Sequence, residues 1–341
     1  MKHTLAIAIT TIFLAQASPA ALAQVAKRPL LPEGNLFLDI GNFSPLETDI
    51  RAYGGVDVAS GNVKFKDGFE WDTDETSLAG AVDVSADSII VSGGLSLESR
   101  TQSGTSGGIL YESETDSSQL VGIVGSEIGE GLFLSAQLER IVIENTQTAS
   151  LGSVSLSSSV EVEYFDLTVG SSFDLNETIS IGGSLSPAVS DKKEYSGVLS
   201  GIEYRAGHGQ ILILGVGARI QSFAVGFDVA QFGEELDAEA PKGSAYFLSG
   251  EILIADEISL GGYYSSSSFD PLKENNQFVS SAIDGSFLGV EGRKQFNNIV
   301  ISIGYQKSSF EGKDTGDTVF DADRFDTADD STLSLSIVAD I

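Results

Sequence analysis

The sequence predicts an all-β fold, a single antiparallel up-and-down transmembrane β-barrel of about 14 strands. Three observations predict it. Apolar residues recur at every second position in many segments of about ten residues. Short turns and longer polar loops alternate between those segments, which is typical of barrels that cross a membrane. The first residues have the composition of a secretory signal, which directs a chain out of the cytoplasm.

The N-terminal segment has the three parts of a cleaved signal peptide. Met1-Lys2-His3 is basic, residues 5–14 are apolar, and Ala21-Leu22-Ala23 forms a small-x-small cleavage site before Gln24. The apolar part is too short to cross a bilayer, since a helix needs about 20 apolar residues. We therefore expect 1–23 to be removed, 24–48 to form a periplasmic extension or plug, and 49–341 to form the barrel.

The chain is strongly acidic, with 49 Asp and Glu residues, 19 Lys and Arg residues and a formal net charge of −30. Nucleic acids are not expected partners, because they bind basic patches. Acidic clusters such as Asp321 to Asp330 fall between apolar segments, so we expect most of the charge on solvated loops. The absence of cysteine excludes disulfides, thiolate metal sites and a cysteine nucleophile.

The period-two alternation gives each predicted strand two different faces. Ile179, Ile181 and Leu185 alternate with Ser180 and Ser184, and the segments 89–97, 246–254 and 299–305 repeat the pattern. Each run is close to the 9–11 residues with which a tilted strand crosses the hydrocarbon layer. No segment of the expected mature chain has 18 consecutive apolar residues, so the sequence predicts no transmembrane helix.

The connections between the runs fall into two classes. The predicted tight turns are 86–87, 129–131, 175–177, 207–209, 255–257 and 296–298. The predicted long loops are 100–108, 144–152, 188–194, 222–243, 267–279 and 310–330. Because the two classes alternate along the chain, the turns are expected at the periplasmic end of the barrel and the loops at the opposite end.

These connections separate the expected strands, with 12 and 16 strands as the alternative counts. The strands are expected near 49–58, 76–85, 88–99, 117–126, 131–143, 160–173, 177–187, 195–205, 210–221, 244–254, 258–266, 282–295, 298–307 and 331–341.

The last predicted strand carries a class-level resemblance. Leu333, Leu335, Ile337, Ala339 and Ile341 alternate with Ser334, Ser336, Val338 and Asp340 to the end of the chain, and in this the chain resembles the porin-type barrels of Gram-negative outer membranes. The class usually ends in an aromatic residue, whereas this chain ends in Ile341. About 14 strands with an N-terminal extension is also similar to the long-chain fatty-acid transporters. That family's Asn-Pro-Ala start is absent near Gln24, and this chain is short for the family.

If the apolar faces contact lipid, the opposite faces line a lumen. Charged residues are costly on a lipid face, by about 2–4 kcal/mol at the midplane, so their position on the opposite face favours a polar interior. The predicted pore-lining residues are Arg51, Asp83, Glu98, Glu139, Asp166, Glu203, Arg205, Arg219, Glu251, Glu291 and Arg293. Arg140 and Lys294 fall on the lipid-facing side, near the ends of their strands, where the cost is small.

The expected function is a porin-like channel for passive diffusion of small hydrophilic solutes or ions, with a mild cation preference because acids outnumber arginines inside. A salt-bridged, plugged interior is the structural alternative. The functional alternatives are a transporter of hydrophobic substrates with an N-terminal plug, and a closed barrel that displays loops as an adhesin or anchor. A secreted soluble β-protein is the alternative to a membrane barrel. The expected partners are outer-membrane lipid and lipopolysaccharide, and homo-oligomerisation is left open.

Two further features of the sequence bear on function. The loop 222–243 contains Phe223, Phe227 and Phe232, and it is expected either to fold into the barrel as a constriction or to extend a strand outward. His208 lies between two glycines in a predicted turn, where a turn residue is favoured over a catalytic base. We therefore expect no catalytic residue, no metal ligand and no cofactor.

Overall fold

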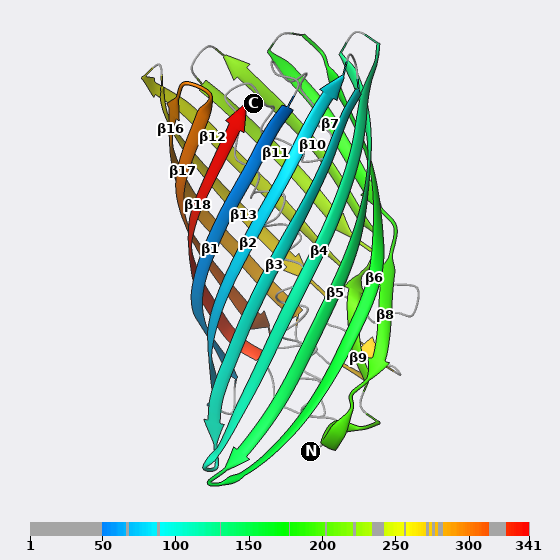
Figure 1. The fold of residues 1–341 in the computed structure, drawn as a ribbon, viewed down its shortest axis with the longest axis vertical. Coiled ribbons are helices and arrows are strands. Elements are labelled where there is room, and N and C mark those ends of the chain that lie inside the picture. The colour runs from blue at the N-terminus through cyan, green and yellow to red at the C-terminus, as the bar shows by residue number, and fades with distance from the viewer. Residues whose placement is uncertain are drawn as a thin grey trace.

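The protein is a closed antiparallel barrel of 14 strands, as a computed structural model shows (Figure 1). The model describes residues 50–65, 68–86, 89–129, 131–176, 178–201, 203–220, 223–233, 242–255, 257–270, 273–274, 277–278, 282–313 and 325–340. The predicted signal peptide 1–23 and extension 24–48 lie outside these residues. Among the described residues, no helix is long and apolar enough to cross a membrane.

Each wall strand pairs with its neighbours around the ring, and β1 closes it by pairing with β18. The wall strands are β1 (Ile50–Phe65), β2 (Glu70–Ala86), β3 (Ile89–Ser106), β4 (Ile109–Gly129), β5 (Leu132–Leu151), β6 (Val154–Asp174), β7 (Ile179–Ser186), β10 (Ile211–Ile220), β11 (Phe223–Phe232), β12 (Gly243–Ala255), β13 (Ile258–Phe269), β16 (Ala282–Phe296), β17 (Ile299–Lys313) and β18 (Phe325–Asp340).

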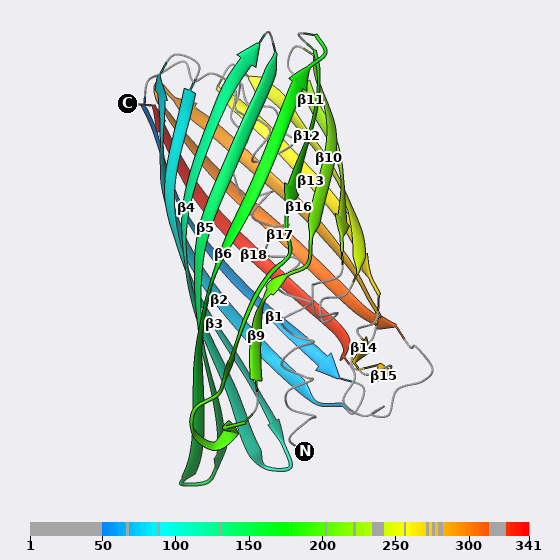
Figure 2. The same ribbon diagram turned by 90° about the vertical axis from the view of Figure 1, so that its right-hand side faces the viewer.

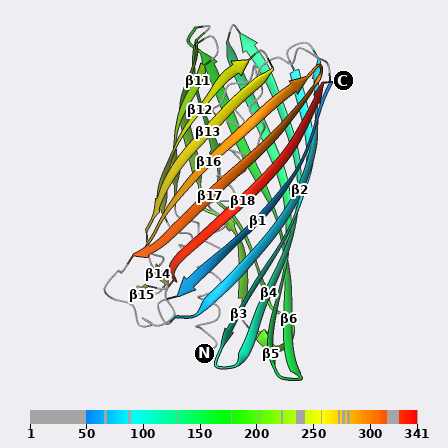
Figure 3. The same cartoon turned by 90° about the vertical axis from the view of Figure 1, so that its left-hand side faces the viewer.

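The barrel has two different ends. At one end, which we call the turn end, short connections join β2 to β3, β4 to β5, β6 to β7, β10 to β11, β12 to β13 and β16 to β17. The C-terminal end of β18 lies at this end, at the top of Figure 1. The opposite end is the loop end. It holds the connection from β13 to β16, in which β14 (Lys273–Glu274) pairs with β15 (Gln277–Phe278) (Figure 3).

The outer face carries an apolar belt next to the turn end. On β3, Ile89, Val91, Leu95 and Leu97 are all exposed and point outward, and the outward positions after Leu97 are serine and threonine. The same change from apolar to polar occurs along β6, where Glu163 follows the outward-facing Phe165 toward the loop end, and along β13, where Ser266 follows Tyr264. A belt of this kind is the surface that a barrel presents to the hydrocarbon layer.

Strands β3 to β6 continue well past the apolar belt at the loop end. β4 has 21 residues, whereas β11 on the other side of the barrel has 10. The outer parts of these strands, 99–106, 109–118, 140–151 and 154–163, form a curved sheet that projects beyond the rest of the barrel, at the bottom of Figure 1. We call this projection the lip.

A two-stranded ribbon lies between β7 and β10 in the chain. It consists of β8 (Val189–Glu194), the single turn η1 (Gly197–Leu199) and β9 (Glu203–His208), and its sheet is separate from the barrel sheet. Figure 2 shows it close to the end of β6 that forms the lip. The ribbon and β6 contact each other without forming a ladder.

The expected strand count is confirmed, but two of the expected elements are wrong. Residues 195–205, expected in the wall, belong to the ribbon. Residues 223–232, expected in a long loop, form wall strand β11, so this segment is no constriction loop. The predicted turn 207–209 is also wrong, because it lies at the junction of β9 and β10 on the loop side. The predicted loops 100–108 and 144–152 are mostly the strands of the lip.

Candidate functional site

The inner face of the wall is the candidate functional site, and its two halves differ in chemistry. The half near the turn end is lined by polar and charged side chains, many of them buried, and by one apolar cluster of Ile90, Ile123 and Phe133. The half near the loop end contains three apolar clusters. Because side chains alternate along each strand, the polar side chains and the apolar clusters both lie on the inner face of the wall, and the apolar belt lies on the outer face.

A charged cluster joins three strands in the turn half. The Arg293 guanidinium on β16 contacts Glu291, with Nε and Oε1 2.8 Å apart, and Glu251 on β12, with Nη1 and Oε1 3.3 Å apart. Ser259 on β13 donates a hydrogen bond to the Glu251 carboxylate. All three charged side chains are largely buried, so the arginine is held between two carboxylates in a place with little water.

Other carboxylates of the turn half are bound by neutral donors. Tyr53 on β1 donates its hydroxyl to Asp83 on β2. The Glu139 carboxylate on β5 accepts from the side-chain amides of Gln119 and Gln137. Each carboxylate is therefore hydrogen-bonded to the wall itself, which removes part of the cost of burying its charge.

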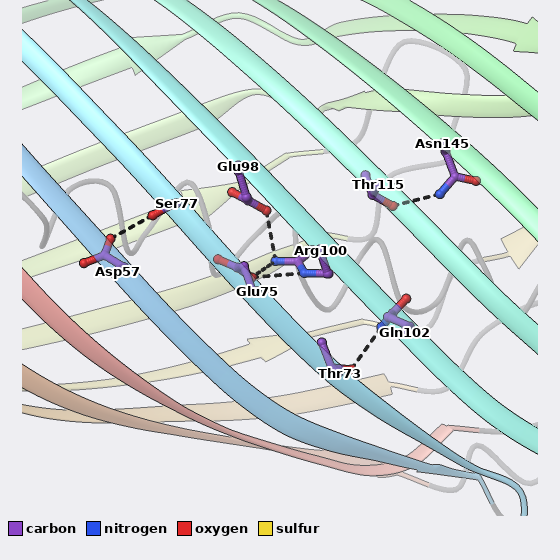
Figure 4. A network of polar contacts seen from close by, with 9 residues as sticks. All are labelled: Asp57, Thr73, Glu75, Ser77, Glu98, Arg100, Gln102, Thr115 and Asn145. Carbon is purple, nitrogen blue, oxygen red and sulfur yellow. Dashed lines mark hydrogen bonds and ion pairs between the residues drawn. The ribbon is translucent and has the colours of Figure 1, made fainter.

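Nearer the loop end, a chain of polar contacts crosses β1 to β5 (Figure 4). Arg100 on β3 pairs with Glu75 on β2, with Nε and Oε2 3.0 Å apart, and with Glu98, with Nη2 and Oε1 3.2 Å apart. Figure 4 also shows the bond from Ser77 to Asp57, the bond from Gln102 to Thr73 and the bond from Asn145 to Thr115. These contacts connect the β1–β2 wall to the base of the lip.

The largest apolar cluster of the loop half lies on the inner side of β16, β17, β18, β1 and β2. Its buried members are Val63, Phe65, Trp71, Ile283, Phe287 and Phe310, and Phe69, Tyr111 and Ala328 pack against them. The Phe69 ring stands nearly perpendicular to those of Trp71 and Tyr111, at centroid distances of 5.6 and 6.1 Å. Aromatic rings favour this edge-to-face packing.

Two smaller apolar clusters occupy other sectors of the loop half. Ile213, Ala230 and Ala245 form one on β10, β11 and β12, with Phe232 and Phe247 packed against it. The other lies on β5 and β6, beneath the ribbon. It contains Val160, Val162, Tyr195 and Tyr204, with Ile143, Tyr164 and Leu199 packed against them. Apolar side chains therefore face inward from several sides near the loop end.

The structure places most of the predicted pore-lining residues on the inner face of the wall, by the alternation of the strands. These are Arg51, Asp83, Glu98, Glu139, Asp166, Glu251, Glu291 and Arg293. Of the predicted set, Glu251, Glu291 and Arg293 come together in one cluster, and Arg51 lies opposite Asp83 in the register of β1 and β2. Glu139 lies opposite Asp166 in the register of β5 and β6. Their role in lining a water-filled pore stays a prediction.

Three of the predicted lining residues have a different outcome. Glu203 and Arg205 belong to β9 and not to the wall, so their predicted position is wrong. Arg219 is on wall strand β10. The side chains of all three lie outside the described residues. The two charges expected on the outer face are there, since Arg140 pairs with Glu163 and Lys294 lies over the ring of Phe296.

Sequence reasoning missed polar residues of the lip and of the neighbouring strand β2. Glu75, Arg100, Asn145 and Gln147 were assigned to polar segments outside the predicted strands, because those strands were limited to the length that crosses a bilayer. The alternation continues through these segments, and following it beyond the hydrocarbon layer would have placed all four on the inner face. No sequence signal pointed to Tyr195 as the hydrogen-bond partner of Asn145.

Comparison with known proteins supports the barrel fold. No protein-family model matches the chain, and no curated protein sequence matches it. The translocator domain of autotransporter NalP from Neisseria meningitidis is 12% identical, with a TM-score of 0.54, over 96% of each chain. A Pseudomonas aeruginosa FadL homologue is 10% identical, with a TM-score of 0.62, over 86% of this chain and 91% of that chain.

The Pseudomonas putida toluene transporter TodX is 10% identical, with a TM-score of 0.60, over 87% of this chain and 90% of that chain. At such low identities these likenesses show a shared outer-membrane barrel fold and nothing about activity.

Proposed function

We propose that the chain is a passive outer-membrane channel whose solutes are small hydrophobic molecules. The observation that carries this proposal is the apolar lining of the loop half, above all the cluster around Trp71 and Phe287. Sites for small apolar molecules are lined by hydrophobic and aromatic side chains with a few polar groups. Polar side chains of the loop half, such as Thr73, Gln102 and Asn145, lie on the β2 to β5 side, whereas the aromatic residues Phe287 and Phe310 line the β16–β17 side.

The structural neighbours support the same choice. Two of them are described as a FadL homologue and a toluene transporter, and others as monoaromatic hydrocarbon channels. They are similar to this chain only at the level of the barrel fold, so they add to the argument from the lining without replacing it.

A hydrophilic channel is the second candidate, and one observation favours it. The turn half is lined by buried serines and carboxylates, including Ser92 and Glu139, and by the half-buried Gln137, which would suit polar solutes. A hydrophobic solute would have to leave the apolar half and pass this polar region. The two candidates therefore predict faster uptake of different solutes.

Uptake by cells tests the proposal. The lipopolysaccharide leaflet of a Gram-negative host slows the entry of apolar solutes, so we expect expression of the chain to raise the initial uptake of radiolabelled toluene severalfold. Uptake of a radiolabelled disaccharide should not change. A rise in disaccharide uptake with unchanged toluene uptake would show the hydrophilic channel instead.

A substitution tests whether toluene uptake depends on the apolar cluster. Phe287→Ser should lower toluene uptake, because it places a hydroxyl in the apolar cluster that the solute is proposed to contact. Phe296→Ser, on the outer face at the turn end, is the matched control and should not lower it. Heat-modifiable migration on gels confirms that both variants are folded.

A further inference from the structure

The ribbon formed by β8 and β9 is not needed to close the barrel. β7 pairs with β6 on one side and with β10 on the other, so the ring of wall strands is complete without the ribbon. The β6–β7 ladder ends at Val169 and Leu185, while β6 continues to Val154 along the lip. The ribbon lies against this part of β6 and could leave it without opening the wall.

The ribbon joins the wall through two short interruptions at the same level. The β7–β10 ladder ends at the pair Ser186–Ile211, and the β8–β9 ladder begins at the pair Val189–His208. Pro187 lies in one interruption and Gly209 in the other. Proline has no backbone N–H to donate to a ladder, and glycine tolerates wide changes in backbone angles, so this pair of interruptions has the properties of a hinge.

One buried tyrosine ties the ribbon to the lip. The Tyr195 hydroxyl donates to Asn145 Oδ1 at 2.6 Å, and Gln147 Nε2 donates to the same oxygen at 2.8 Å. Asn145 in turn donates to Thr115 Oγ1 at 2.8 Å. Tyr195 is 3% exposed and Asn145 is fully buried, so a single contact of the ribbon completes a polar network on two strands of the lip, β4 and β5.

A second set of contacts is apolar and small. The rings of Tyr195 and Tyr204 stand edge to face, with centroids 5.8 Å apart, and cover Val160 and Val162 on β6. They lie on the inner face of the lip, at the loop end of the barrel. The ribbon therefore covers an apolar part of the inner wall that would otherwise face the entrance.

Further contacts tie the ribbon to the strand β6 itself, among them a hydrogen bond from the Glu163 amide to Asp191 Oδ2 at 3.3 Å. The Ser196 amide donates to the Ser159 carbonyl at 2.8 Å, and the Leu199 amide donates to Ser158 Oγ at 2.9 Å. These groups lie beyond the apolar belt, so water can replace each bond when the ribbon moves away. The free-energy cost of release is then the cost of replacing a few hydrogen bonds by bonds to water and of exposing one small apolar cluster.

We propose that the β8–β9 ribbon is a hinged flap, held shut by the contact of Tyr195 with Asn145, and that its release admits solute to the inner wall at the loop end. The inference rests on the proposed function only in that a solute crosses the barrel. Lids of this kind control entry by shifting between a closed and an open population.

A disulfide that locks the flap tests its role in entry. The Oγ atoms of Ser159 and Ser196 are 3.2 Å apart and the chain has no cysteine, so the double variant Ser159→Cys/Ser196→Cys is expected to form one bond on oxidation. Ser150→Cys/Ser155→Cys is the matched control, because these Oγ atoms are 3.1 Å apart at the tip of the lip, between β5 and β6.

Oxidation of the flap pair should lower solute uptake at least about tenfold, and a reductant should restore it. Oxidation of the control pair should change nothing. Full uptake through the oxidised flap variant, with the disulfide verified by mass spectrometry, would overturn the proposal.

Thiol labelling tests the motion without any transport. Ser158 lies under the flap and Ser172 on the same strand lies in the turn half, and both are 4% exposed. A maleimide should label Ser158→Cys faster than Ser172→Cys in the purified protein. Adding Tyr195→Phe, which removes one hydrogen bond, should speed the labelling of Ser158→Cys about two- to tenfold. The labelling rate of Ser172→Cys should not change.

Equal, slow labelling at both positions, unaffected by Tyr195→Phe, would overturn the flap even if uptake occurs. If labelling follows the prediction but the barrel carries neither toluene nor disaccharide, the flap motion is supported and the proposed function is rejected. The two failures are therefore distinguishable.

Discussion

Arg293 on β16 and Glu251 on β12 form an ion pair across the strand that separates them. Their Nη1 and Oε1 atoms are 3.3 Å apart, and the intervening position on β13 is Gly261, which pairs with Glu251 on one side and with Glu291 on the other. Because Gly261 has no side chain, the longer side chains meet above it. The ion pair therefore connects strands that share no ladder.

Removing the arginine should destabilise the barrel strongly. Arg293 is 3% exposed and Glu251 is 10% exposed as side chains, so Arg293→Ala leaves two acidic groups with little water and no cation. Breaking a buried pair in this way costs about 3–5 kcal/mol. Equilibrium unfolding in urea, in lipid vesicles, measures the change. Arg140→Ala is the control, because its pair with Glu163 is on the outer surface, and we expect no measurable change there. An equal loss in both variants would contradict this assignment.

The position of the apolar belt predicts how charges are tolerated along one face of β3. Leu95 lies within the belt and Thr101 lies in the lip, and both point outward. Leu95→Arg should cost about 2–4 kcal/mol in lipid, because it places a cation in hydrocarbon. Thr101→Arg should cost nothing measurable. The free energy of unfolding from vesicles distinguishes them, and similar values for both would place the hydrocarbon layer elsewhere.

The tyrosines of the flap predict a pH dependence. Burial raises the pKa of Tyr195 and that of Tyr204 above the ordinary value, because the phenolate is poorly solvated there. The closed flap is therefore stabilised by neutral phenols below pH about 10, and this stabilisation is lost as the pH rises through the raised pKa. The difference in absorbance at 295 nm between the protein and Tyr195→Phe should titrate above pH about 10. A difference curve centred at the ordinary pKa would contradict a buried phenol.

Much of the fold follows from local sequence pattern, and the exceptions have physical causes. Alternation identified most wall strands and the face of each, because a strand between lipid and lumen must separate apolar from polar residues. The segment 195–205 also contains short alternating runs, and the flanking Gly207 and Gly209 are typical of a turn. The two glycines instead lie at the hinge between the β7–β10 and β8–β9 ladders. This position depends on long-range strand pairing, which a local sequence pattern does not reveal.

The segment 223–232 shows the opposite error. Phe223, Val225, Phe227 and Val229 alternate clearly with smaller residues, but no Gly, Asn or Pro marks the connection at 221–222 that precedes them. Without that turn signal, the segment is grouped with the polar residues after Phe232, and the whole stretch 222–243 is predicted as one long loop. The two errors cancel in the strand count, while strand β10 between them runs opposite to the predicted direction.

The interior was harder to predict than the wall. Sequence parity placed Glu251, Glu291 and Arg293 inward, and the structure joins them. The apolar clusters of the loop half were not foreseen, because Val63, Phe287 and Phe310 lie far apart in the sequence and meet only when the barrel closes. The expectation of a hydrophilic lumen followed from the charged residues alone.

The most direct test of the proposed function uses the single tryptophan. Trp71 is 3% exposed within the apolar cluster, so its fluorescence reports on solutes that enter there. Nitrobenzene, an apolar aromatic quencher, should quench it saturably in the refolded protein, and toluene should compete. The control is Trp71→Phe/Thr101→Trp, whose tryptophan lies on the outer face of the lip. Quenching that rises linearly and equally in both proteins, without competition by toluene, would contradict a hydrophobic solute site in the barrel.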